Sequence, residues 1–128
     1  HIDEIDDATI SKVIELAEVE EVRQLARRVH VSDAVTGYML DIIGSLRQDP
    51  DIANGPGPRG TIALYKCCRA RALLDERDFV IPDDVKALGA AILGHRLRVK
   101  SEAEMEGVTP ETVVERVMAR VAVPKVEA

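Results

Sequence analysis

The feature that most constrains the fold is a series of helix-start signals spread along the chain. Each signal is a side chain that caps a helix, or a proline that suits the first helical position, followed by apolar residues at helical spacing. The four signals are Ser32, Pro58, Pro82 and Thr109-Pro110. Residues 15–28, ahead of them, also have helical spacing. Because short connections join these segments, the sequence predicts an all-α fold, a small bundle of about four to five helices.

Apolar stripes mark the expected core. The clearest stripe follows Ser32 and consists of Val35, Tyr38, Met39, Ile42, Ile43 and Leu46. Weaker stripes are Val22, Leu25, Ala26 and Val29 in the first segment, and Val113, Val114, Val117, Met118 and Val121 in the last. Hydrophobic residues make up 46% of the chain but aromatic residues only 2%. A core of aliphatic side chains favours packed helices over a β-sandwich.

The turn Gly55-Pro56-Gly57-Pro58-Arg59-Gly60 places an arginine at a predicted helix start. A helix start has unpaired N–H groups and a partial positive charge, so a cation there is mildly unfavourable unless it faces an anion. Free N–H groups, a glycine-relieved turn and a guanidinium together suit a phosphate group. The alternative is a Pro/Gly-rich turn with a solvated Arg59, and composition alone leaves both interpretations open.

The helix predicted from Pro58 to about Asp75 has a basic side and an apolar arc. Arg59 and Lys66 lie two turns apart and nearly aligned, with Arg69 beside them. The apolar arc is expected to hold Ala63, Leu64, Cys67, Cys68, Ala70, Ala72 and Leu74.

Three residues of this arc need separate explanations. Arg71 falls inside the arc, so it must extend to solvent or pair with a buried acid. Cys67 and Cys68 are adjacent, and adjacent helical side chains diverge too far for an unstrained disulfide. We expect both to be small, buried, reduced thiols.

The segment after Pro82 contains two acids, a glycine and a basic run. Asp83 and Asp84 fall in the first turn of a predicted helix, where they suit the helix dipole, and we interpret them as capping residues rather than metal ligands. Gly94 is expected to end this helix. The basic run His95–Lys100 is expected to be extended.

Several kinds of chemistry are absent from the sequence. It has no Gly-x-x-x-x-Gly-Lys-[Ser/Thr] phosphate loop, no apolar strand ending in Asp-Glu, no zinc-ligand spacing and no Ser/His/Asp or Cys/His set. Phosphoryl transfer to water needs a phosphate cradle, a metal ion and a positioned nucleophile. The chain by itself is therefore not a complete enzyme.

In their order and spacing, these motifs resemble the C-terminal helical lid of a MoxR-type AAA+ ATPase. The resemblance runs from about Val29 to Val121, most of the chain. Its sharpest parts are the Gly-x-x-Pro-Arg turn at residues 55–59 and the helix start Asp83-Asp84-Val85, and Leu93-Gly94-His95-Arg96-Leu97 and residues 102–108 follow in the same order.

The resemblance implies a division of the chain and a role for its arginine turn. Residues 15–121 would be the lid, residues 1–14 an acidic lead-in from an ATPase core domain upstream, and residues 122–128 a C-terminal tail. Arg59 would be the sensor 2 residue, which reaches the γ-phosphate of ATP bound on the core. Pro58, Arg59 and Gly60 would contact the nucleotide, with Lys66 as a secondary candidate. Lys66, Arg69 and the basic run His95–Lys100 could contact either the nucleotide or a neighbouring subunit. The family usually has Ser where this chain has Gly57, and Gly caps a helix less well.

The resemblance also implies a cofactor and partners. The cofactor is ATP, as Mg-ATP held mainly by the core domain, and no metal site is expected on this chain. The partners are the core domain, neighbouring subunits of a ring (typically a hexamer) and proteins with a von Willebrand factor A domain, in a chaperone-like remodelling machine. No apolar run approaches the roughly 20 residues that span a bilayer, and no signal-peptide pattern opens the chain, so we expect a cytoplasmic location and no membrane partner.

Two other classes of function are alternatives. A small helical nucleic-acid-binding module would use the basic residues Arg59, Lys66, Arg69 and Arg71. These residues do not share one face, and a net charge of −6 lacks the basic excess that phosphate-backbone binding usually shows. A structural protein-interaction bundle would need none of these arginines.

Overall fold

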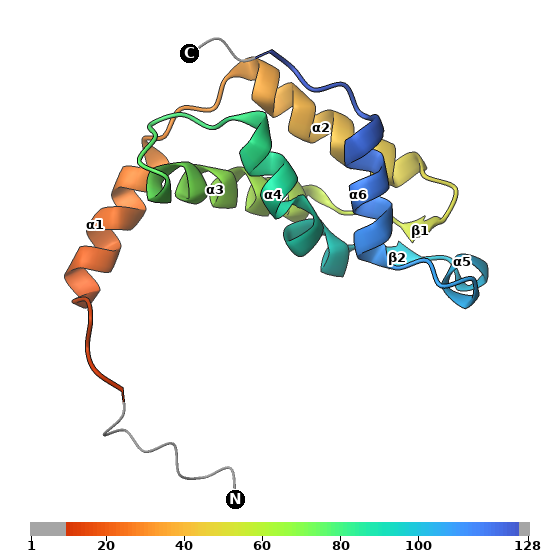
Figure 1. Cartoon of the computed structure of the whole chain (residues 1–128), viewed down its shortest axis with the longest axis horizontal. Coiled ribbons are helices and arrows are strands. Elements are labelled where there is room, and N and C mark those ends of the chain that lie inside the picture. The colour runs from red at the N-terminus through yellow and green to blue at the C-terminus, as the bar shows by residue number, and fades with distance from the viewer. Residues whose placement is uncertain (1–9, 126–128) are drawn as a thin grey trace, which may run out of the picture.

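The computed structural model describes residues 10–125, which form a mainly helical domain with one small sheet (Figure 1). The elements are α1 (Leu16–Arg27), α2 (Asp33–Gln48), β1 (Ile52–Asn54), α3 (Pro58–Leu74), α4 (Pro82–Leu93), the 3₁₀ turn η2 (Gly94–Arg96), β2 (Arg98–Val99), α5 (Ser101–Met105) and α6 (Pro110–Arg120). The predicted all-α bundle is confirmed, with the two-stranded sheet as an addition. In the expected lead-in and tail, residues 10–14 and 122–125 contain no helix or strand, and residues 1–9 and 126–128 lie outside the described residues.

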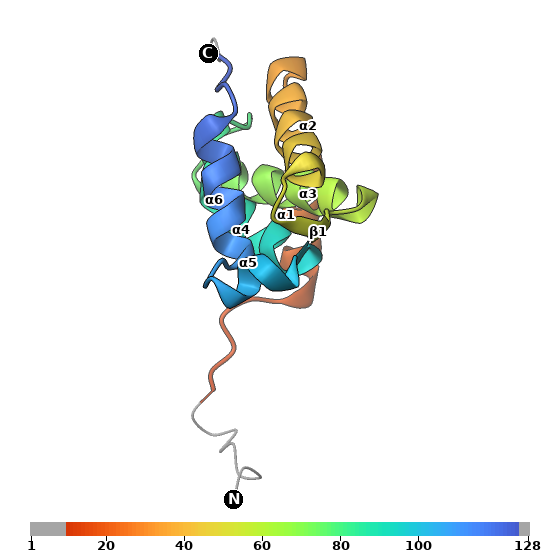
Figure 2. The same ribbon diagram turned by 90° about the vertical axis from the view of Figure 1, so that its right-hand side faces the viewer.

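Four helices surround the core. Figure 2 shows α2 and α6 side by side, with α3 crossing behind them, and α4 contacts α2, α3 and α6. The sequence sets where these helices start: Ser32 Oγ accepts a hydrogen bond from the Val35 N–H at 3.2 Å, and Thr109 Oγ1 accepts one from the Thr112 N–H at 3.2 Å. The six predicted stripe residues of α2 are all buried, as are Val113, Val114, Val117 and Met118 of α6. None of the helices within residues 10–125 is long and apolar enough to cross a membrane.

The first helix does not contribute to the core as its apolar stripe suggested. It leans away from the bundle in Figure 1 and contacts α3, but none of its side chains is buried. Val22 is 41% exposed and Leu25 49% exposed, while Val29, just after the helix, is buried. The stripe gives α1 an apolar side, but within the described residues the contact with α3 leaves this stripe partly exposed.

The connection between α3 and α4 is organised by Asp84, which is buried. Asp84 Oδ2 accepts a hydrogen bond from the Ile81 N–H at 2.9 Å and so caps α4, as predicted. Both carboxylate oxygens also bind the guanidinium of Arg77, at 2.6 and 2.9 Å. Arg71 Nε lies 3.5 Å from Asp84 Oδ1, so Arg71 pairs with a buried acid, one of the two outcomes expected for an arginine within the apolar arc. The hydrogen bonds with Asp84 raise the pKa of Arg77 above its usual value.

The apolar arc of α3 is narrower than predicted. Leu64, Cys68 and Ala72 are fully buried, but Leu74 is 79% exposed and Cys67 is exposed. The expectation of two buried thiols is therefore wrong for Cys67. Both cysteines are free, and burial raises the pKa of Cys68 to about 12, which makes this thiol a poor nucleophile.

The segment after α4 also differs from expectation. α4 ends at Leu93 with Gly94 as its C-cap, as predicted, but Gly94 is not left-handed: its φ is −56°, and it begins the 3₁₀ turn η2. A Cβ on Gly94 would lie 3.2 Å from Oε1 of Glu111 in α6, so the Glu111 side chain packs closely over this glycine. The basic run His95–Lys100 is extended only in its second half, where β2 pairs antiparallel with β1. His95 Nδ1 lies 3.2 Å from the Ala91 carbonyl oxygen, a local structural contact.

Candidate functional site

The start of α3 presents Arg59 to solvent. The N-cap is Gly57, in an extended conformation and without a side-chain cap, and Pro58 occupies the first turn. No acidic residue lies in that turn, although acids are the usual complement of the positive end of a helix. Arg59 is exposed, and it forms no ion pair within 4 Å among residues 10–125. Its guanidinium is therefore available to an anion.

The turn before α3 is fastened to α2. Arg47 Nε donates a hydrogen bond to the Pro56 carbonyl oxygen at 2.9 Å. At Gly55 the chain passes so close to α2 that a Cβ would lie 2.9 Å from the Cα of Arg47 and 2.7 Å from its Cγ. Gly55 is thus required by a close backbone approach. These two contacts fix the path of the turn that leads into α3, and thereby the position of Arg59 in the first turn of that helix.

A hollow of about 550 Å³ opens at this helix start, and we call it the arginine hollow. It is lined by Gly57, Pro58, Arg59, Gly60 and Arg96. The structure thus brings together the three residues predicted to contact a nucleotide and adds Arg96, from η2. Gly60 is buried, and its N–H donates to the Gly57 carbonyl oxygen at 3.0 Å, so its own backbone donor is engaged within the turn.

The chemistry of the arginine hollow fits a phosphate group. Guanidinium groups present planar pairs of N–H donors that match phosphate oxygens, and no carboxylate lines this hollow. A metal ion, by contrast, has no site on the described part of the chain, where no group of three or more His, Cys, Asp or Glu side chains could hold one. Any Mg²⁺ bound with a nucleotide would need its protein ligands elsewhere.

Lys66, the secondary candidate, lies in a different place. It lines a second hollow of about 400 Å³ between α1 and α3, the basic hollow, with Arg23, Ala26, Arg27, Arg69 and Ala70. Arg69 is held there by a hydrogen bond from Nη1 to the Arg27 carbonyl oxygen at 3.0 Å, and its guanidinium lies 4.8 Å from the ring centre of Tyr65. The basic side predicted for α3 therefore divides between two hollows, and Lys66 does not share one with Arg59.

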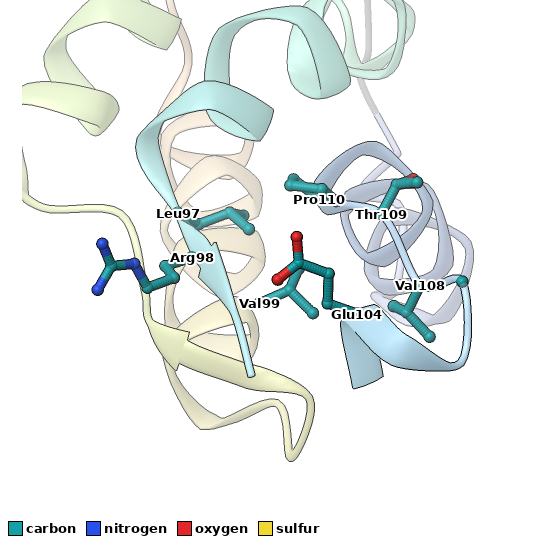
Figure 3. Close-up of a pocket in the computed structure, with 8 residues that line it drawn as sticks. Leu97, Arg98, Val99, Glu104, Val108, Thr109 and Pro110 are labelled. Carbon is teal, nitrogen blue, oxygen red and sulfur yellow. The ribbon is translucent and has the colours of Figure 1, made fainter. Parts of the chain in front are cut away.

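A third hollow, of about 430 Å³, lies between β2, α5 and α6 (Figure 3). The carboxylate of Glu104 points into it, between Leu97 and Pro110, while Arg98 extends to the opposite side of β2. The negative charge of the Glu104 carboxylate would repel a phosphate group placed here. This hollow is therefore a poor nucleotide site, although it is comparable in size to the basic hollow.

Known protein families include one whose sequence pattern covers the arginine hollow. A sequence model of the family described as the AAA lid domain matches residues 44–117, which span β1, α3, α4, the sheet and most of α6. The match includes the whole arginine hollow.

The chain belongs to the AAA lid domain family.

Its relatives include MoxR proteins. This lid is 37% identical over 116 residues to YeaC of Bacillus subtilis, covering 91% of the chain and 36% of YeaC. It is 27% identical over 126 residues to the chaperone MoxR1 of Mycobacterium tuberculosis, covering 91% of the chain and 33% of that protein. The crystal structure of a "putative ATPase" from Cytophaga hutchinsonii superimposes with a TM-score of 0.81 at 27% identity, over 85% of the lid and 36% of that chain. The lid thus spans about a third of the length of these relatives.

The sequence indicated Arg96 only as one member of the basic run His95–Lys100, not as an individual residue. It belongs to a basic run in which no helical or alternating pattern distinguishes it from His95 or Arg98. Its position depends on where η2 comes to rest against α3, and this is a tertiary contact. The only local signal was Gly60, a small residue inside a helix, which often marks a close approach.

Proposed function

We propose that this lid closes over ATP bound to an AAA+ core domain and supplies Arg59 as the sensor 2 residue for ATP hydrolysis. The observation that carries the proposal is the position of Arg59: exposed, unpaired within residues 10–125, and in the first turn of α3 where no acid balances it. A guanidinium at this place gains most when a phosphate group approaches the positive end of the helix.

The proposal divides the chemistry between two parts of a longer protein. The sequence lacks a phosphate loop and an Asp-Glu strand, so the core domain holds Mg-ATP and the attacking water. The lid contributes charge: Arg59 stabilises the negative charge that grows on the transferring γ-phosphate. Arg47 positions this arginine, because it holds the Pro56 carbonyl and thereby the turn that leads into α3.

The wider setting is proposed by relationship to MoxR chaperones. The assembled protein would be a cytoplasmic ring, typically a hexamer, that remodels other proteins together with partners bearing a von Willebrand factor A domain. The nucleic-acid-binding alternative loses support, since its basic residues divide between the arginine hollow, the basic hollow and the buried contact of Arg71 with Asp84. They do not form one continuous surface for a nucleic-acid backbone.

The test is the Arg59→Ala substitution in the intact ATPase. Loss of a transition-state donor should lower the hydrolysis rate about ten- to a thousandfold, roughly 1.4–4 kcal/mol, judged from comparable donors in other enzymes. The affinity for ADP should change little, because ADP has no γ-phosphate. Arg59→Lys should restore activity only in part, since an ammonium cannot reproduce the two-pronged guanidinium contact.

The matched control is Arg98→Ala, which removes the same charge nearby but outside the arginine hollow. It should leave turnover unchanged. If Arg59→Ala hydrolyses ATP at the wild-type rate with an unaltered circular dichroism spectrum and melting temperature, the sensor role is wrong and the turn is simply a helix start.

A further inference from the structure

We propose that Arg96 is a second phosphate-binding arginine, which acts with Arg59 on the same nucleotide. This inference rests on the proposed function and extends it by one residue from a separate element, η2. Arg96 would bind the phosphate chain from η2, while Arg59 binds it from the start of α3, so that two guanidinium groups contact the same ligand.

The small sheet explains why these two arginines meet. β1 ends at Asn54, and the chain continues into the turn that carries Arg59. β2 begins at Arg98, and the chain that precedes it carries Arg96. The strands are antiparallel, with Asn54 paired to Arg98 and Ile52 to Val99. Both arginine-bearing segments therefore leave the same end of one ladder, and the pairing fixes them beside each other.

Gly60 gives η2 the space to approach α3. A Cβ at this position would lie 3.4 Å from Cδ of Arg96, 3.3 Å from Cβ of Pro56 and 3.6 Å from Cδ2 of Leu93. Gly60 lies in the first turn of α3, and its small size leaves the stem of Arg96 close to the helix backbone without a clash. The stem of Arg96 packs over Gly60 and directs the side chain to the rim of the arginine hollow.

The charge arrangement is unfavourable without an anion. Arg96 is exposed and, like Arg59, has no acidic partner within 4 Å among residues 10–125. Some arginines have partners, since Arg116 binds Asp49 and Asp51 and the half-buried Arg69 binds a backbone carbonyl. Arg98 is also exposed without an ion pair among residues 10–125, so Arg59 and Arg96 are distinguished by lining the same hollow. Two guanidinium groups that line one hollow without a carboxylate repel each other, and a multiply charged phosphate chain would relieve this repulsion.

The experiment measures nucleotide binding separately from hydrolysis. In the intact ATPase, the dissociation constant of a non-hydrolysable ATP analogue is measured for wild type, Arg96→Gln, Arg96→Lys and Arg98→Ala. Arg96→Gln should raise this constant about three- to thirtyfold, because a charge-assisted contact is lost at an exposed site. Arg96→Lys should recover part of the affinity. Arg98→Ala, two residues along the chain and outside the hollow, should stay within about twofold of wild type.

A combined variant tests whether both arginines bind one ligand. If they do, Arg59→Ala with Arg96→Gln should lose less affinity than the product of the two single losses, because the first loss already misplaces the phosphate for the second arginine. An Arg96→Gln variant that binds the analogue as well as wild type, while Arg59→Ala still slows hydrolysis, overturns the role of Arg96 and leaves that of Arg59. Equal losses in Arg96→Gln and Arg98→Ala also overturn it, since general surface charge then explains the effect. If Arg59→Ala itself is silent, the proposed function fails first.

Discussion

Replacing the buried Asp84 with alanine should destabilise the lid much more than replacing its exposed neighbour Asp83. The side chain of Asp84 is 2% exposed, and its carboxylate accepts hydrogen bonds from Arg77 at 2.6 and 2.9 Å and from the Ile81 N–H at 2.9 Å. Removing one member of a buried ion pair costs about 3–5 kcal/mol, because the remaining charge stays without a partner. The Arg77 side chain keeps 21% exposure, so water can replace part of the loss, and we expect the lower end, about 3 kcal/mol.

The measurement is urea unfolding of the chain followed by circular dichroism, with the melting temperature as a second readout. A loss of about 3 kcal/mol corresponds to a fall in melting temperature of roughly 10–15 °C for a domain of this size. Asp83→Ala is the matched control: it also removes an acid from the first turn of α4, but Asp83 is exposed, so the cost should stay below about 1 kcal/mol.

Asp84→Asn tests which part of the interaction matters. Its amide oxygen can still accept from the Ile81 N–H, but the charge that holds Arg77 is lost, so we expect a value between those of wild type and Asp84→Ala. If Asp84→Ala and Asp83→Ala unfold at the same urea concentration with equal m-values, the α3–α4 connection is not held by this ion pair and the reasoning is refuted.

Two further predictions concern the cysteines and the glycines. A thiol reagent should label Cys67 rapidly and Cys68 only on unfolding. Burial raises the pKa of Cys68 from 9.0 to about 12, so the folded chain retains a proton that the unfolded chain loses, and the free energy of unfolding should fall as pH rises from about 9 to 12. Urea titrations should find a smaller slope in Cys68→Ala, where only groups such as Tyr38, whose pKa is also raised by burial, still contribute. Gly55→Ala should destabilise the lid by about 1–3 kcal/mol because its Cβ would meet the backbone of Arg47, whereas Gly57→Ser, with open space and an extended backbone, should be neutral or stabilise by a few tenths of a kcal/mol as a helix cap; comparing the two melting temperatures checks both.

The sequence predicted the helices well because their signals are local. Ser32 and Thr109 cap the helices that follow them, and the apolar stripe of α2 is buried throughout. The sheet was missed, since strands of three and two residues are too short to show alternation. The stripe of α1 misled because spacing shows that a helix is amphipathic but not what covers it.

For the candidate site, the sequence indicated Arg59 by itself but Arg96 only as part of the basic run His95–Lys100. An arginine in a first turn is visible locally, since Pro58 fixes where the helix begins. The position of Arg96 beside Arg59 depends on the pairing of β1 with β2 and on the packing of η2 against Gly60. The separation of Lys66 from Arg59 similarly depends on α1, which supplies Arg23 and Arg27 to the basic hollow.

The two-stranded ladder also sets when the arginine hollow exists during synthesis of the chain. α2 and α3 are contiguous in sequence and can pack as soon as both have emerged, since their contacts close only a short loop. β1 must wait for β2, which follows α3, α4 and η2 in the chain, so this pairing closes a longer loop than the α2–α3 contacts do. A nascent chain that ends before Arg98 holds the Arg59 turn without the ladder that places Arg96 beside it. The hollow is thus a property of the completed fold, and any anion that it binds stabilises the finished domain but not its earlier folding intermediates.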